Sequence, residues 1–316
     1  MLFEKNEGDY PLINLMEKMK KIKIDSVIYG FDTNFKHHKD IRASFNTLTE
    51  ITFGFSMEEW YLDGYWNATY IPYSLLHEDK IISNVFVNII EFIIEEEKKI
   101  GIQIGTVMTK KEYQNRGLNR FLMEKVLSDW KAKVDFIYLF ANKSVLEFYP
   151  KFNFEMVNEY QYSRPVNNNV GTSSIKRLHI ENTEEREFLE ETLKTSVPIS
   201  KVSMHDNAPL IMFYCLSIKK NCIYYIDVLK AIVIADFKDD TLYLNDVFCA
   251  EYLNLSNVIQ ALSGKDIKKV VLGFTPLNET SFDRRLLKAE DTLFMLKDKG
   301  EYFKNNHWMF PVLSHA

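Results

Sequence analysis

Cysteine is scarce in this chain of 316 residues, which contains only Cys215, Cys222 and Cys249. Three cysteines cannot all pair within one chain, and no Cys-x-x-Cys motif occurs. A disulfide framework is therefore excluded, and reduced thiols are expected. Cys215 and Cys222 fall on apolar patterns typical of strands, so we predict buried positions for both.

Long apolar runs and an excess of basic residues are also missing. No apolar stretch is long enough to span a bilayer, and none follows a basic head at the N-terminus. Acidic residues outnumber basic residues by 44 to 39, which gives a net charge of −5. A nucleic-acid surface usually needs a clustered basic face. We therefore expect a cytoplasmic protein with neither a membrane nor a nucleic-acid partner.

The length of the chain predicts two domains. Hydrophobic residues make up 46% of the sequence, so both halves can bury a sizeable core. Residues 164–174 contain Pro, Gly, three Asn and three hydroxyl residues, which is the composition of a linker. We therefore predict a first domain at 1–163, a linker at 164–174 and a second domain at 175–316.

In the first half, the hydrophobic periodicity predicts helices followed by a mixed sheet. The loop of the helical region is expected near Gly64, and a turn at 77–80 makes a hairpin of two strands. The expected helices are 12–22, 45–66 and a stretch ending near 131, and the expected strands are 70–75, 81–92, 100–109 and 134–141.

The second half repeats this order of elements without the glycine-bearing loop. This repetition suggests a diverged internal duplication, supported by order and spacing alone. The expected helices are 181–193 and 253–261, and the expected strands are 211–218, 222–229, 231–236, 242–248, 269–274 and a last strand at 310–315.

The loop Gln114-Asn-Arg-Gly-Leu-Asn119 follows a strand and opens a helix. A helix that begins directly after a loop presents unpaired N–H groups, and its dipole favours an anion there. Gly117 allows close approach and unusual backbone angles, and Arg116 and Arg120 add positive charge. The loop by itself predicts either a phosphate-binding site or an ordinary tight turn.

A second motif lies downstream, where Asn142 ends the next strand and an aromatic-rich helix is expected at 146–154, with the pairs Phe148-Tyr149 and Asn153-Phe154. With both motifs at this spacing, residues 41–160 resemble the GNAT (Gcn5-related) N-acetyltransferase superfamily. That family has an acetyl-CoA loop of the form Gln/Arg-x-x-Gly-x-Gly/Ala, and here Asn119 stands at its last position. Asn153 stands where the family has Gly, which is a mild exchange because both residues tolerate left-handed backbone angles.

The resemblance implies an α/β (α+β) fold, a mixed and mostly antiparallel sheet flanked by helices, in two tandem GNAT-like domains of which the second lacks the cofactor loop. It also implies acetyl-CoA as co-substrate, with no metal. Its pantetheine arm and pyrophosphate are assigned to the following residues: Val107, Met108, Thr109, Gln114, Asn115, Arg116, Gly117, Leu118, Asn119, Arg120 and Asn142.

The resemblance gives Tyr149 the role of general acid. A phenol with a pKa of about 10 holds a proton at neutral pH and can give it to the departing thiolate. The backbone N–H of Met108 is placed to polarise the thioester carbonyl. The general base is left open among Glu91, Glu155 and a water relay, and a surface role is the plainer interpretation of both carboxylates.

The expected function is thus N-acetylation of a primary amine, carried by a small molecule or a peptide, through direct attack in a ternary complex. The alternatives are a non-catalytic CoA-binding sensor or scaffold, an aminoacyl transferase, and an acetyl-CoA domain that tethers an interaction module. A homodimer is compatible with the sequence. His37-His38 has no ligand partner at a suitable spacing, so no metal site is predicted. Six aromatic residues either line the acceptor site or pack between helix and sheet: Phe53, Phe55, Trp60, Tyr61, Tyr65 and Trp66.

Overall fold

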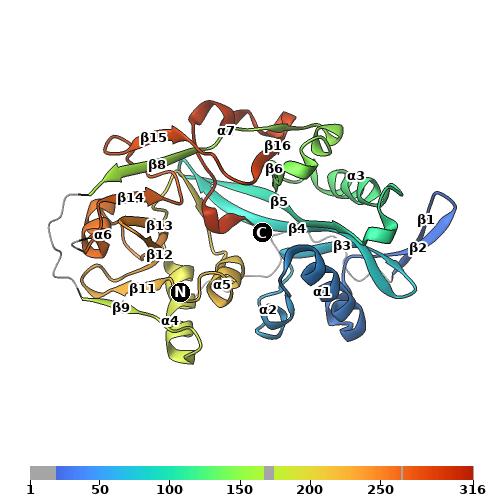
Figure 1. Ribbon diagram of the computed structural model, residues 1–316, viewed down its shortest axis with the longest axis horizontal. Coiled ribbons are helices and arrows are strands. Elements are labelled where there is room, and N and C mark those ends of the chain that lie inside the picture. The colour runs from blue at the N-terminus through green and yellow to red at the C-terminus, as the bar shows by residue number, and fades with distance from the viewer. Residues whose placement is uncertain (1–18, 167–173, 265, 316) are drawn as a thin grey trace, which may run out of the picture.

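The computed structural model describes residues 19–166, 174–264 and 266–315. Two β-sheets with helices on their faces build the molecule (Figure 1). The first sheet begins with antiparallel strands, and only β5 and β6 pair in parallel. Its order is β1 (Lys20–Ile24), β2 (Val27–Asp32), β3 (Tyr70–His77), β4 (Lys80–Ile94), β5 (Glu97–Thr109), β6 (Phe136–Ala141), β16 (Thr292–Leu296) and β7 (Phe154–Met156), with β10 (Val202–Met204) paired to the end of β4.

Helices cover both faces of the first sheet (Figure 1). Helix α3 (Leu118–Trp130) connects β5 to β6 and buries Leu118, Leu122 and Val126 at helical spacing. On the other face lie α1 (Lys39–Phe53), α2 (Glu58–Leu62) and α5 (Ala208–Leu216), whose apolar side chains share a second core cluster with the sheet. The sheet therefore separates two hydrophobic cores.

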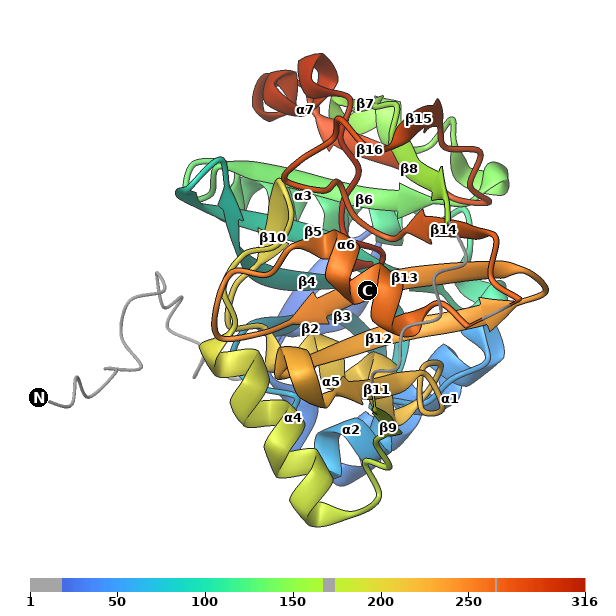
Figure 2. The ribbon, with the colours of Figure 1, turned by 90° about the vertical axis from the view of Figure 1, so that its left-hand side faces the viewer.

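The second sheet lies toward the viewer in Figure 2. Its strands β13 and β14 are parallel and are connected through α6 (Leu255–Leu262). Helices α4 (Thr183–Thr195) and α7 (Glu301–Asn306) complete the fold. The order is β15 (Asp283–Leu286), β8 (Tyr160–Pro165), β14 (Lys269–Leu272), β13 (Thr241–Phe248), β12 (Ala231–Lys238), β11 (Ile223–Ile226) and β9 (Ile175–Arg177).

The two sheets exchange one strand each. Strand β16 comes from the second half of the chain but lies between β6 and β7 of the first sheet. Strand β8 spans the end of the predicted first domain and the first two residues of the expected linker, but it lies between β14 and β15 of the second sheet. Strand β16 runs antiparallel to β6, which follows α3, and β8 runs antiparallel to β14, which follows α6. The two exchanged strands therefore occupy equivalent positions in the two sheets. Of the expected linker, residues 167–173 lie outside the described residues, and the division into domains stays a prediction.

Most of the expected elements are present, and the mixed, mainly antiparallel fold class is confirmed. The expected strand at 211–218 is wrong, because these residues belong to α5. Pro209 is tolerated in the first turn of that helix. The helix contributes side chains to two hydrophobic cores and is apolar on more than one face. Its sequence is therefore a continuous apolar run without the periodicity that indicates a helix.

Three other local predictions need correction. The expected last strand at 310–315 contains a short 3₁₀ helix at Val312–Ser314 instead. The expected aromatic-rich helix after β6 consists of two 3₁₀ turns, Lys143–Val145 and Tyr149–Phe152. Most of the expected helix at 12–22 lies outside the described residues, and its last residues belong to β1.

Candidate active site

Strand β5 bulges at Thr106, where it passes β4. The pairing shifts there, since Asn84 faces Met108 whereas Phe86 faces Gly105. Thr106 has a φ of +45°, which is uncommon for a β-branched residue. Asn84 holds the bulge by donating from Nδ2 to the Thr106 carbonyl at 3.0 Å. Strained backbone of this kind often marks a functional site.

Strands β5 and β6 separate just before the bulge. Their parallel pairing runs from Gly101 only to Ile104, so the last residues of β5 have no partner on β6. The two strands therefore splay apart beside residues 107–109. A ligand can reach the free edge of β5 at this point.

The loop before α3 is open on its outer side. Gly117 caps the helix with a φ of +73°, and a Cβ added to it would meet no atom within 4 Å. Asn115 also has a left-handed backbone, with a φ of +62°. The first N–H groups of a helix have no partner within it. Arg116 and Arg120 are exposed beside them, and the Arg116 guanidinium lies 4.9 Å from the centroid of the Tyr113 ring.

A cavity of about 660 Å³ begins at this splay and continues beneath α1, α2 and α5. Val107, Asn119, Asn142 and Tyr149 all line it, so the tertiary structure brings both sequence motifs to one place. Met108 is buried in the core instead. The remaining predicted contacts lie outside the cavity wall: Thr109, Gln114, Asn115, Arg116, Gly117, Leu118 and Arg120.

Residues 37–157 match the model of the acetyltransferase (GNAT) domain. They form a GNAT domain. The resemblance stated from the two motifs is confirmed over this segment, which identifies residues 37–157 as an acyltransferase domain. No curated protein sequence matches the chain.

Solved structures show the same fold for most of the chain. A probable N-acyltransferase of unknown function from Enterococcus faecalis has a TM-score of 0.56 at 16% identity, with 88% of this chain and 71% of that chain covered. A GCN5-related N-acetyltransferase from Kribbella flavida has a TM-score of 0.52 at 13% identity, with coverages of 84% and 71%. Both alignments extend well beyond the GNAT domain.

Tyr149 of the GNAT domain lies in the cavity wall with 5% of its surface exposed. Its ring packs against Phe148 and Phe294, at centroid distances of 5.3 and 5.7 Å. Burial raises the pKa of the phenol to about 12. The hydroxyl has no hydrogen-bond partner among the described residues, so its proton is available to a ligand.

Asn142 and Asn119 are held by hydroxyl-bearing neighbours. Asn142 Oδ1 accepts hydrogen bonds from Ser144 N at 3.0 Å and from Ser144 Oγ at 2.6 Å. Asn119 Oδ1 accepts from Ser83 Oγ at 2.7 Å and from Thr109 Oγ1 at 2.8 Å. Both side chains therefore have fixed positions at the edge of the cavity.

The sequence did not point to three further polar residues of the cavity. Asn88 and Gln103 face each other across β4 and β5 and are almost fully buried. Polar residues at inward positions of an apolar strand were the available signal. His315 stacks on Phe140 with ring centroids 3.6 Å apart, and nothing in the sequence places it here.

Aromatic side chains from α1, α2 and the loop between them form the opposite wall of the cavity. Phe53, Phe55 and Trp60 line it, as expected, whereas Tyr61, Tyr65 and Trp66 lie outside the lining. Trp60 stands at a right angle to Tyr70 with ring centroids 4.7 Å apart. Its indole N–H donates to the Pro209 carbonyl at 2.8 Å, which ties α2 to α5.

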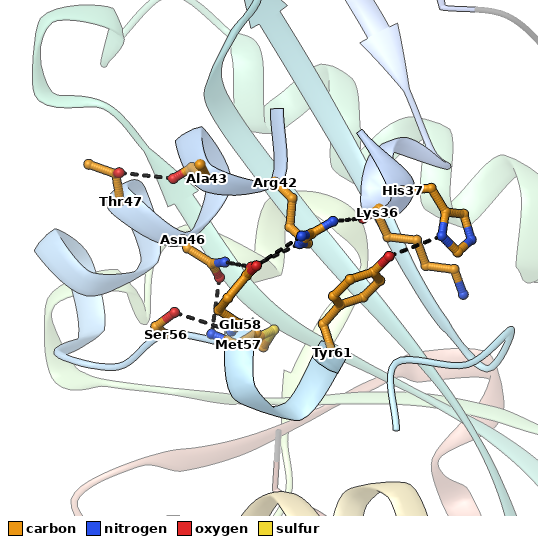
Figure 3. A network of polar contacts seen from close by, with 10 residues as sticks. All are labelled: Lys36, His37, Arg42, Ala43, Asn46, Thr47, Ser56, Met57, Glu58 and Tyr61. Atoms are coloured by element: carbon orange, nitrogen blue, oxygen red, sulfur yellow. Dashed lines mark hydrogen bonds and ion pairs between the residues drawn. The ribbon is translucent and has the colours of Figure 1, made fainter. Parts of the chain in front are cut away.

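A partly buried ion pair, in which 7% of the Arg42 side chain and 37% of the Glu58 side chain are exposed, fixes α2 against α1 (Figure 3). Arg42 donates from Nε and from a terminal nitrogen to the two carboxylate oxygens of Glu58, both at 2.8 Å. Asn46 Nδ2 donates to the same carboxylate at 2.8 Å, and Asn46 Oδ1 accepts from Met57 N. Met57 lines the cavity, so this network positions part of its wall.

The carboxylates considered as general bases are not in the cavity. Glu91 pairs with Lys98 at 2.8 Å, and Glu155 pairs with Lys304. Neither carboxylate belongs to the cavity lining. Within residues 19–166, 174–264 and 266–315, no three His, Cys, Asp or Glu side chains are grouped to hold a metal ion. Over the same ranges, every helix is too short or too polar for a membrane span.

Proposed function

We propose that this protein is an acetyl-CoA-dependent N-acetyltransferase acting on a primary amine. The proposal rests on one observation: a single cavity joins the free edge of β5, Asn142 and the Tyr149 hydroxyl to a separate region lined by aromatic residues. Two substrates can therefore meet in one cavity. The match of residues 37–157 to the GNAT acetyltransferase domain supports this reaction class.

The residues around α3 fit a pyrophosphate. The open outer side of Gly117, the free N–H groups of the first turn and the exposed Arg116 and Arg120 offer donors and positive charge to an anion. The unpaired edge of β5 at 107–109 offers backbone groups to the pantetheine amides. Acetyl-CoA bound in this way would supply the acetyl thioester.

The reaction needs one proton to move from nitrogen to sulfur. The amine nitrogen forms the amide bond, the thioester C–S bond breaks, and Tyr149 gives its phenolic proton to the thiolate. The proton that the nitrogen loses then protonates the Tyr149 phenolate and restores the phenol. Burial favours the neutral phenol, so Tyr149 holds this proton over the working pH range.

Thiol release from acetyl-CoA across a panel of amines tests the proposal. Tyr149→Phe should lower kcat about 10²- to 10⁴-fold, because it removes the proton donor. The fold should persist, because the hydroxyl has no partner among the described residues. Tyr252→Phe, at an exposed tyrosine, is the matched control. Full activity of Tyr149→Phe would remove the acid assignment, and thermal stabilisation by CoA without any transfer would favour the non-catalytic sensor.

The second half supports a tandem arrangement. The path β12, β13, α6, β14 repeats the path β4, β5, α3, β6, including one antiparallel pair and one parallel crossover. No glycine opens α6, whose first turn is capped by the Asn254 side chain. We infer a diverged GNAT-like copy that no longer binds the cofactor and instead supplies residues of α5, Ile218 and His315 to the cavity. The cytoplasmic location and the homodimer stay predictions.

A further inference from the structure

The half of the cavity that faces away from α3 is apolar. It is bounded by α1 and α2 on one side and by α5 on the other. Charged side chains of the lining are confined to the rim, where Glu147, Lys151 and Asp291 are all exposed. Its wall consists of the following residues: Phe53, Phe55, Met57, Trp60, Tyr70, Phe86, Phe140, Leu210, Phe213 and Tyr214.

The mouth of this half exposes two large apolar side chains. Phe53 at the end of α1 is 43% exposed, and Ile218 just after α5 is 69% exposed. Both line the cavity, although they come from distant parts of the chain. Paired apolar side chains at the mouth of an apolar cavity mark a binding surface for an apolar group.

Two polar side chains of the cavity lining, those of Asn88 and His315, each carry a buried atom that has no hydrogen-bond partner among the described residues. Asn88 is 2% exposed, and its Oδ1 accepts no hydrogen bond from any described residue. His315 Nε2 is likewise buried and unpaired within the described part of the chain. An unpaired buried polar atom destabilises the free protein, and a ligand that satisfies the atom relieves this cost.

His315 is held in place by groups other than its free nitrogen. Its ring stacks on Phe140, and its carbonyl accepts a hydrogen bond from the Tyr214 hydroxyl. The preceding Ser314 carbonyl accepts from the Tyr138 hydroxyl at 3.2 Å. Burial lowers the pKa of His315 to about 3, so the imidazole is neutral and offers one nitrogen as a hydrogen-bond acceptor.

We propose that the acceptor substrate is a primary amine on an apolar body, which lies between Phe53 and Ile218 while its N–H groups donate to Asn88 Oδ1 and His315 Nε2. This inference rests on the proposed function and specifies its acceptor. The neutral amine is the form that attacks the thioester, and an apolar cavity favours that form over the ammonium. A polyamine would have to bury further charges without partners, which is strongly unfavourable.

Thiol release and calorimetric binding, each measured with hexylamine, 2-phenylethylamine and spermidine, test this inference. The apolar amines should give a kcat/KM at least tenfold above that of spermidine. Ile218→Ser should raise KM for hexylamine about 5- to 20-fold at unchanged kcat, because it removes apolar contact area. Ile51→Ser is the matched control, since Ile51 is 75% exposed and lies outside the cavity lining.

Two His315 variants test the polar contact. His315→Phe keeps an aromatic ring against Phe140 but removes the acceptor nitrogen, and kcat/KM for hexylamine should fall about 10- to 100-fold. His315→Gln restores an acceptor and should recover part of the loss. His179→Gln, at an exposed histidine, should change nothing. The dissociation constant for acetyl-CoA should be the same in all of these variants.

The outcomes separate this inference from the proposed function. Preference for spermidine, or equal effects of Ile218→Ser and Ile51→Ser, would overturn the inference while acetyl transfer itself stands. Absence of thiol release with every amine would overturn the proposed function, and calorimetry would still decide whether the cavity prefers an apolar amine. Equal activity of His315→Phe and the wild type would remove His315 from the acceptor site.

Discussion

The side chain of Asn119 is joined to that of Ser83 by a hydrogen bond of 2.7 Å. Asn119 lies in the first turn of α3, and Ser83 lies near the start of β4. Thr109, at the end of β5, donates to the same Asn119 oxygen and lies 2.8 Å from the Ser83 hydroxyl. Three side chains thereby join the two central strands to the helix that bounds the proposed pyrophosphate site.

Replacing Asn119 by Ala should destabilise the protein by about 1 to 2 kcal/mol. The change removes an acceptor for two hydroxyls, of which Ser83 is fully buried. Urea unfolding monitored by circular dichroism measures the effect. Glu124→Ala, at an exposed position of α3, is the control. Equal unfolding midpoints for the two variants would show that the triad adds nothing to stability.

Removing the carboxylate of Glu58 should destabilise the protein by about 2 kcal/mol. The side chain of Arg42 is 7% exposed and would lose the two Glu58 oxygens to which it donates hydrogen bonds. The hydrogen bonds from Arg42 lower the pKa of Glu58 below its ordinary value of 4.5. Its contribution is therefore complete above pH 4.5 and is lost as the pH falls through the lowered value.

Urea unfolding of Glu58→Ala at pH 7 checks this expectation. Glu191→Ala is the matched control, because its partner Lys194 is 3.7 Å away and both side chains are exposed. The Glu58 variant should also weaken catalysis, since Met57 and Trp60 beside it line the cavity. A stability loss no larger than that of the control would contradict the prediction.

Stability should fall as the pH rises from about 4.5 to 7. Burial raises the pKa of Glu159 from 4.5 to about 7, although its Oε1 accepts from Phe310 N at 2.9 Å. Within this window the folded protein keeps a proton that the unfolded chain releases, so folding becomes less favourable as the pH increases. Glu159 alone accounts for a loss of roughly 3 to 4 kcal/mol at most, at 1.36 kcal/mol for each unit by which its pKa rises.

Glu159→Gln should reduce this slope and stabilise the protein at pH 8, because the amide oxygen can still accept from Phe310 N. Burial also raises the pKa of Asp246 to about 7, so Asp246→Asn should remove a similar part of the slope. Chemical unfolding at several pH values between 4.5 and 8 measures both effects. An unchanged slope in the double variant would refute the assignment.

Neither half of the chain should fold alone if the chain is cut at the expected linker. A fragment of residues 1–163 lacks β16 and leaves β6 and β7 without their shared neighbour. A fragment of residues 175–316 lacks β8, which joins β14 to β15. Each fragment would expose apolar strand edges. Mixing the two fragments should restore a cooperative thermal transition, whereas a cooperative transition of 1–163 alone would establish an independent first domain.

Local patterns predicted β3, β4, β5 and β6 of the first sheet and the start of α3. Gly117 takes the left-handed backbone expected at the start of α3, and Leu118, Leu122 and Val126 bury the expected face. These features depend on residues within a few positions of one another, so periodicity and turn chemistry reveal them. The strand expected at 211–218 was wrong for the same reason, because a continuous apolar run has no local periodicity from which a helix could be recognised.

The proposed acceptor site is formed by contacts between residues far apart in the sequence, which local patterns cannot predict. Tyr138 and Ser314, which are joined by a hydrogen bond, stand 176 positions apart in the chain. The sequence does not reveal that Asn88 Oδ1 and His315 Nε2 are buried without a hydrogen-bond partner in the described part of the chain. The exchange of β8 and β16 was hidden too, because short strands have the same alternation in either sheet.

The proposed cofactor site could be predicted from the order of residues, since a glycine-bearing loop, a helix start and a Phe-Tyr pair follow one another along one continuous segment. The proposed acceptor site could not, because it is formed by the packing of distant segments. There, α5 and His315 from the second half lie against strands of the first half, and a cavity between distant segments has no signature in the order of residues.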